Sequence, residues 1–306
     1  MGFLFIFLGF LVCGSAKKWQ IDNARDYFLL LFPKTIAIFL YYLCSAFLIV
    51  SFCIMVAGCG TLFYEQFSVR PVVGAALSLL LCYYIIKNRV DGLAGFNGFV
   101  TPLMFLGVMV LCVVLLRRNA GEIRQVAGAP MQAAFSGVLY IGYNMVSAVA
   151  VLVPSAALAS TKRKAALGGA LGGIFVAIPL VLINVVLIGA PSMHYEELPF
   201  FSLVGITYPA LQPFCSVILY CAMLTTAASS GVSVLAQVPQ KSVGKYAFLL
   251  CFVALFVSFV PFSVLVKTMY TTFGVCGIVL IAGVLKSFLR KQKNSELIKR
   301  KQKQYK

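Results

Sequence analysis

The chain has 306 residues, of which 61% are hydrophobic and 11% are charged, and its formal net charge is +17. A soluble domain is about half apolar and about a quarter charged, so this composition excludes an ordinary soluble protein. The positive charge does not indicate nucleic-acid binding, because the basic residues lie in connections and in the tail. An outer-membrane barrel would show short alternating segments instead. We therefore predict an all-α polytopic membrane protein in contact with a lipid bilayer.

Apolar segments recur along the chain with polar connections between them. Nine of them are expected to cross the membrane as helices, since a bilayer core requires ~20 residues or slightly fewer. The expected spans are 1–16, 35–62, 71–86, 99–116, 131–160, 165–190, 207–237, 245–260 and 262–288. They form one transmembrane domain, 1–288, followed by a basic tail, 289–306. An amphipathic piece is expected near Tyr27–Phe32, and residues 191–206 are expected to form a loop.

The first expected span is short, and a signal peptide is the obvious alternative. No positive residue precedes its apolar run, whereas a signal peptide has a basic start. We expect a membrane helix whose beginning is missing.

Most of the 25 lysine and arginine residues fall in alternate connections and in the tail. The positive-inside rule then predicts a cell-membrane protein with a cytoplasmic C-terminus and places Met1 outside. The ten cysteines are scattered singly, without a Cys-x-x-Cys pair, and are interpreted as small buried apolar residues.

The expected span 131–160 is the focus of the functional prediction. It is about 30 residues long, or roughly 45 Å as a straight helix, and it carries glycines, tyrosines and an asparagine. One interpretation is a broken helix with a polar opening near mid-membrane, as at the binding sites of secondary transporters. The other is a single tilted helix whose polar groups bond to neighbouring helices. The sequence leaves both open.

Small residues indicate where helices approach closely. The span 165–190 opens with two overlapping small-xxx-small pairs, which favour tight helix packing. They are Gly168, Gly169, Gly172 and Gly173. A phosphate-binding loop is not favoured, because no strand precedes them and no Gly-Lys-Ser/Thr follows. Ala57, Gly58 and Gly60 predict a second close approach.

Two stretches resemble the YkvI-type bacterial membrane proteins. The first runs from Ala57 to Pro102 and contains AGCGTLFYEQF and NRVDGLAGFNGFVTP; the second is LYIGYNMVSAVAVLVP at Leu139–Pro154. That family is grouped with the amino acid–polyamine–organocation transporters, whose LeuT-like fold has two inverted five-helix repeats. The resemblance makes the nine expected spans helices 2 to 10 of that fold, with the first helix apparently missing.

The resemblance implies a secondary transporter of a small, amino-acid-like organic solute. The expected span 131–160 takes the place of helix 6, and its solute-binding residues would be Tyr140, Gly142, Tyr143, Asn144 and Ser147. Helix 8 of this fold often gives paired hydroxyls to a sodium ion, and hard cations favour oxygen ligands. The corresponding residues would be Thr225, Thr226, Ser229 and Ser230. Alternatively, these hydroxyls bond their own backbone or join neighbouring helices, and the protein is a non-transporting scaffold or sensor.

Other chemistry has less support. None of the eight acidic residues falls in the middle of an expected span, which favours sodium coupling, or none, over proton coupling. His194, Glu196 and Glu197 could bind a metal, but a surface loop is the favoured interpretation. No His-Glu-x-x-His or Gly-x-Ser-x-Gly motif is present, so an enzyme is not expected. We expect no cofactor apart from a possible Na⁺.

Overall fold

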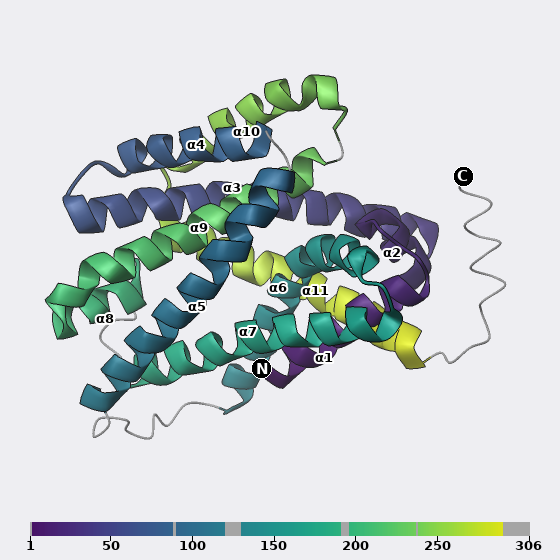
Figure 1. Ribbon diagram of the computed structural model, residues 1–306, viewed down its shortest axis with the longest axis horizontal. Helices are drawn as coiled ribbons and strands as arrows, with labels where there is room; N and C mark the ends of the chain where they lie inside the picture. The colour runs from purple at the N-terminus through teal and green to yellow at the C-terminus, as the bar shows by residue number, and fades with distance from the viewer. Residues whose placement is uncertain (1, 88–89, 120–129, 191–195, 237, 290–306) are drawn as a thin grey trace. The chain divides into compact units, whose positions relative to one another are not determined.

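The computed structural model describes residues 2–87, 90–119, 130–190, 196–236 and 238–289 (Figure 1). These residues form helices and no strand, which confirms the prediction of an all-α membrane protein. Seven helices in the described ranges are long and apolar enough to cross a membrane. They cover Lys34–Phe67, Asn97–Arg118, Phe135–Leu158, Lys162–Ile188, Pro209–Leu235, Gln240–Val257 and Phe262–Lys286, and Pro71–Lys87 is a shorter apolar helix.

The helices follow one another along the chain. Their bounds are α1 Gly2–Lys18, α2 Ala24–Leu31, α3 Lys34–Phe67, α4 Pro71–Lys87, α5 Val90–Asn119, α6 Pro130–Leu158, α7 Lys162–Ile188, α8 Pro199–Thr207, α9 Gln212–Leu235, α10 Val243–Val257 and α11 Phe262–Leu289, with 3-10 turns at Pro209–Leu211 and Gln240–Ser242.

One predicted loop contains a helix. Residues 191–206 were expected to be irregular, yet α8 occupies Pro199–Thr207, with a proline in its first turn. Proline suits that position because its missing N–H would have no partner inside the helix. Phe200, Phe201, Leu203 and Val204 are buried, so packing stabilises a helix too short to be stable alone.

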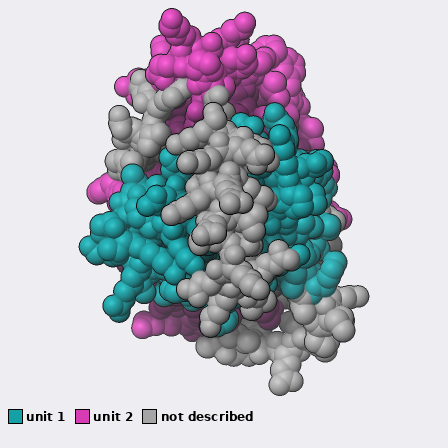
Figure 2. All heavy atoms as spheres, turned by 90° about the vertical axis from the view of Figure 1, so that its right-hand side faces the viewer, with its two compact units in different colours: residues 1–44, 134–174, 271–306 teal, residues 45–133, 175–270 magenta. Residues whose placement is uncertain are grey.

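The chain divides into two compact units, each assembled from separate parts of the sequence. Unit 1 contains residues 1–44, 134–174 and 271–306, and unit 2 contains residues 45–133 and 175–270 (Figure 2). The LeuT-like inverted repeat implied by the resemblance stays a prediction.

Glycines bring helices of unit 1 together. A Cβ atom at Gly169 of α7 would collide with the backbone carbonyl of Gly9 in α1, and one at Gly173 would collide with the backbone at Ile6. A Cβ at Gly168 or Gly172 would meet nothing within 4 Å. The predicted tight packing is therefore a property of Gly169 and Gly173, which lie one turn apart on the same face.

The amphipathic segment predicted near Tyr27–Phe32 is the short helix α2. Asn23 caps it, since its side chain accepts a hydrogen bond from the Asp26 backbone N–H. Tyr27 and Phe28 are fully buried, and the Tyr27 hydroxyl lies 2.8 Å from Ser15 Oγ of α1. Burial raises the pKa of Tyr27 well above its ordinary value, so the phenol stays neutral.

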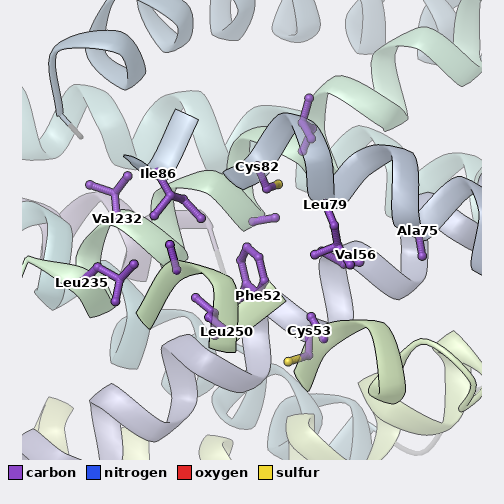
Figure 3. Packing of buried hydrophobic residues seen from close by; sticks show 14 of the residues in the cluster. Phe52, Cys53, Val56, Ala75, Leu79, Cys82, Ile86, Val232, Leu235 and Leu250 are labelled. Atoms are coloured by element: carbon purple, nitrogen blue, oxygen red, sulfur yellow. The ribbon is translucent and has the colours of Figure 1, made fainter. Parts of the chain in front are cut away.

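Helix α9 lies at the centre of unit 2, where it contacts α4, α5, α8 and α10; α4 and α10 lie side by side (Figure 1). An apolar cluster joins α3, α4, α9 and α10, and the ring of Phe52 stands in its middle (Figure 3). A second cluster joins α8 and α9 with parts of α3, α5 and α7. The centre of unit 2 is therefore filled by side chains.

Candidate solute and cation site

Four of the five predicted solute-binding residues share one face of α6 in unit 1. Tyr140, Tyr143, Asn144 and Ser147 follow the i, i+3, i+4, i+7 spacing, and all four are half-buried. The Tyr140 ring packs edge-on against Phe5 of α1, with the ring centroids 6.2 Å apart. Structure and spacing thus bring an amide, a hydroxyl and two phenols onto one face.

Gly142 is not brought together with the other four. At 100° per residue it points to the opposite side of α6, where it is buried. A Cβ atom there would collide with the carbonyl of Gly274 in α11, and one at Gly277 would collide with Gly142. The contacts of Gly142 are therefore those of a close crossing between α6 and α11.

The alternative of a broken helix in this span is wrong. Residues Pro130–Leu158 form one continuous α-helix, which contains Pro154. The Asn144 amide nitrogen donates to the carbonyl of Tyr140 at 2.8 Å, and Ser147 Oγ donates to the carbonyl of Asn144 at 2.9 Å. These side chains bond their own helix, a common use of Asn and Ser in membrane helices.

The span that carries the predicted cation ligands is also continuous, since α9 runs unbroken from Gln212 to Leu235. Thr225 and Thr226 both donate to the carbonyl of Ala222, at 3.1 and 2.7 Å. Thr225 is buried, whereas Thr226 is exposed. Each threonine oxygen keeps lone pairs that the donated hydrogen bond does not use.

Four other polar side chains of α9 bond to other helices of unit 2. Ser216 Oγ donates to Gln66 Oε1 of α3 at 2.5 Å, and Ser78 Oγ of α4 donates to the Tyr220 hydroxyl at 3.2 Å. Nearly three turns further along α9 from Tyr220, Ser230 Oγ donates to Ser51 Oγ of α3 at 3.4 Å. These bonds fit the interpretation that hydroxyls join helices in the membrane.

Asn97 of α5 joins this polar row, and sequence reasoning missed it. Its amide nitrogen donates to Ser229 Oγ at 3.4 Å. Its carbonyl oxygen Oδ1 is buried and has no hydrogen-bond partner, the one such side-chain atom in the described part of the chain. The expected span began at residue 99, so Asn97 was assigned to a connection. An asparagine just before a strongly apolar run was the available signal.

Two adjacent serines of α9 contact different helices: Ser229 bonds to α5 and Ser230 bonds to α3. Ser229 and Ser230 are 100° apart around the helix, and Thr226 points between them one turn earlier. Ser229 and Asn97 are half-buried, and Ser230 and Ser51 are buried. As whole residues Asn97 and Ser229 are thus more exposed than Ser51 and Ser230, although the Asn97 oxygen itself is buried.

Of the three residues in the metal alternative, Glu197 bonds to the start of α11. His194 lies outside the described residues. Glu197 accepts two hydrogen bonds at the start of α11, from the Ser263 backbone N–H at 2.8 Å and from Ser263 Oγ at 2.7 Å. In the described ranges no three His, Cys, Asp or Glu side chains are grouped as a metal site.

A search of curated proteins relates the chain to a bacterial membrane protein. Over 241 residues it is 25% identical to the uncharacterized membrane protein YkvI of Bacillus subtilis (strain 168), covering 76% of this chain and 68% of that protein. No family model and no solved structure matches the chain. The chain is therefore similar to YkvI over most of its length, in agreement with the resemblance seen in the sequence.

Proposed function

We propose that this protein is a secondary transporter of a small, amino-acid-like organic solute in the cell membrane, with sodium as the coupling ion. The observation that carries the proposal is the polar side of α9. Polar groups are costly inside a membrane and tend to mark solute or ion paths. Thr226 is exposed and Ser229 is half-buried within the candidate span Pro209–Leu235.

The two sets of polar residues have different proposed roles. Tyr140, Tyr143, Asn144 and Ser147 offer aromatic faces and hydrogen-bonding groups for a small solute. The α9 hydroxyls offer oxygen ligands for a hard cation. Because α6 and α9 are continuous, neither role uses backbone groups freed by a helix break; side chains would provide the contacts.

Uptake into liposomes tests the proposal. The purified full chain is reconstituted and offered a ¹⁴C-labelled amino-acid mixture, with an inward Na⁺ gradient or with choline in place of Na⁺. We expect uptake that requires the gradient and falls about tenfold or more in Asn144→Ala and Thr226→Ala, since each loses a polar contact to the bound species. Unchanged uptake in both variants would remove the proposed sites.

A second candidate function is a non-transporting scaffold or sensor. The hydrogen bonds of Asn144 and Ser147 within α6 favour it, because a helix that satisfies its own polar groups requires no solute. This candidate predicts that the folded wild-type protein takes up no component of the mixture, with or without a Na⁺ gradient.

A further inference from the structure

We propose that Asn97 of α5 is a sodium ligand, and that its amide oxygen and the Ser229 hydroxyl form the core of a cation site at the contact between α5 and α9. Asn97 is outside the hydroxyl set that the sequence indicated. The inference deepens the proposed function by naming a coupling-ion ligand, and in that sense rests on it.

The unpaired amide oxygen is the starting point. A buried carbonyl oxygen without a partner has lost its bond to water and gained nothing in return, and such atoms are rare in native proteins. The same amide uses its nitrogen to donate to Ser229 Oγ, which fixes the oxygen in place. Asn97 therefore contacts α9 through its amide nitrogen and keeps a strong acceptor on the same amide group with its bonding capacity unused.

The chemistry of the neighbouring groups selects the ligand. Ser229 Oγ accepts from Asn97, and Thr226 Oγ1 donates to its own helix, so both oxygens keep lone pairs. Amide and hydroxyl oxygens are hard, neutral ligands. They do not titrate near neutral pH, so they cannot carry a proton, and Ca²⁺ is usually bound through carboxylates as well. A monovalent hard cation fits this set.

The contact lies toward one end of each of the two helices. Asn97 lies seven residues after the start of α5 at Val90, or about 10 Å along the helix. Ser229 lies six residues before the end of α9 at Leu235, or about 9 Å along the helix. A Cβ atom at Gly98, next to Asn97, would meet nothing within 4 Å. The contact is therefore about two turns from one end of each helix, and the residue next to Asn97 faces open space.

Direct binding of ²²Na⁺ to the purified full chain in detergent tests the inference without any transport step. Asn97→Leu removes the amide at similar volume, and Asn97→Asp keeps an oxygen and adds a charge. Ser78→Ala is the matched control. It removes another hydrogen bond to α9, and neither Ser78 nor its partner Tyr220 has a buried unpaired atom in the wild type. Thermal unfolding of each variant shows that it is folded.

We expect saturable Na⁺ binding by the wild type, unchanged binding by Ser78→Ala, and about 10- to 100-fold weaker binding by Asn97→Leu, the effect of one contact to a charged group. Asn97→Asp should bind Na⁺ at alkaline pH and lose it as the pH falls, because its carboxyl becomes protonated. A purely structural amide would not give this pH profile.

Two results would overturn the inference: a wild type that binds no Na⁺, or Asn97 variants that bind it as the wild type does at every pH. If Na⁺ binding follows the expected pattern while liposome uptake is absent, the cation site is supported and the transport proposal fails.

Discussion

The two units differ in the contacts that join most of their helices, although Gly60 of α3 also lies against the backbone of Pro71 in unit 2. In unit 1, α7 meets α1 at Gly169 and Gly173, and α6 meets α11 at Gly142, so backbone lies against backbone. In unit 2, the ring of Phe52 and its neighbours fill the space between helices, and hydroxyl bonds join α9 to α3 and α4. Without a hydrophobic driving force in lipid, close backbone packing and interhelical hydrogen bonds are both effective solutions.

The two predicted sites differ in where their polar side chains form hydrogen bonds. The polar residues of α6 bond within their own helix, whereas those of α9 include bonds to three other helices of unit 2. Only the second arrangement in the described residues leaves a buried oxygen unpaired. Polar residues in a long apolar span can thus serve either their own turn or a neighbouring helix, and composition does not distinguish the two.

The largest expected effect comes from breaking a glycine crossing in unit 1. Gly169→Leu would drive a side chain into the α1 backbone, which cannot move aside as a side chain can. We expect the free energy of unfolding to fall by more than about 4 kcal/mol, with little folded protein recovered. The measurement is thermal unfolding in detergent together with the monodisperse yield. Gly168→Leu, which faces open space, should stay within about 0.5 kcal/mol of the wild type. Equal losses in the two variants would contradict the crossing.

The corresponding test in unit 2 removes a side chain. Phe52 is fully buried, so Phe52→Ala should leave a cavity and lower the free energy of unfolding by about 3 kcal/mol. Phe39 of the same helix is 64% exposed, and Phe39→Ala should have a much smaller effect. Chemical unfolding in mixed micelles compares them; a Phe52 variant as stable as the Phe39 variant would argue against a side-chain core.

Removing the cap at the start of α11 should lower the free energy of unfolding by an intermediate amount. Glu197 accepts two hydrogen bonds from Ser263 near the positive end of the helix dipole. Glu197→Ala should therefore cost about 1 kcal/mol of unfolding free energy, the usual value of a helix cap. Glu196 is exposed and is the matched control. The idea fails if Glu196→Ala lowers the unfolding midpoint as much as Glu197→Ala does.

The smallest expected effects compare a hydroxyl bond between two helices with a hydroxyl bond within one helix. A double-mutant cycle of Ser51→Ala and Ser230→Ala should give a coupling of about 0.6 kcal/mol, the average for hydrogen bonds between membrane helices. Ser147→Ala breaks a bond within one helix and should change stability by less than about 0.3 kcal/mol. A zero coupling for the serine pair, with a larger loss at Ser147, would reverse the comparison.

Hydropathy and helix signals located most helices well. The expected starts at Pro71 and Phe262 coincide with the starts of α4 and α11, since a proline or a polar connection marks each one. Helix α8 was missed because its nine residues are too few for a span and its stability comes from burial of Phe200 and Phe201. The burial of these side chains depends on contacts with other helices, so it cannot be predicted from the local sequence.

The candidate sites were predictable only in part. The shared face of Tyr140, Tyr143, Asn144 and Ser147 follows from helix spacing alone. The continuity of α6 does not, because Gly142 signals a break and a close crossing equally, and its partner Gly274 is far along the chain. Asn97 could not be linked to Ser229 for the same reason, as 132 residues separate them. Contacts between distant segments decide these points.

The central claim is that the contact between α5 and α9 binds a cation. Sodium-dependent thermal stability tests it most directly, because a ligand that binds the folded state raises the unfolding midpoint as its concentration rises. The account predicts that the midpoint of the wild type and of Ser78→Ala rises when NaCl replaces choline chloride at constant ionic strength, and that the midpoint of Asn97→Leu does not. The same rise in Asn97→Leu, or none in the wild type, would contradict it.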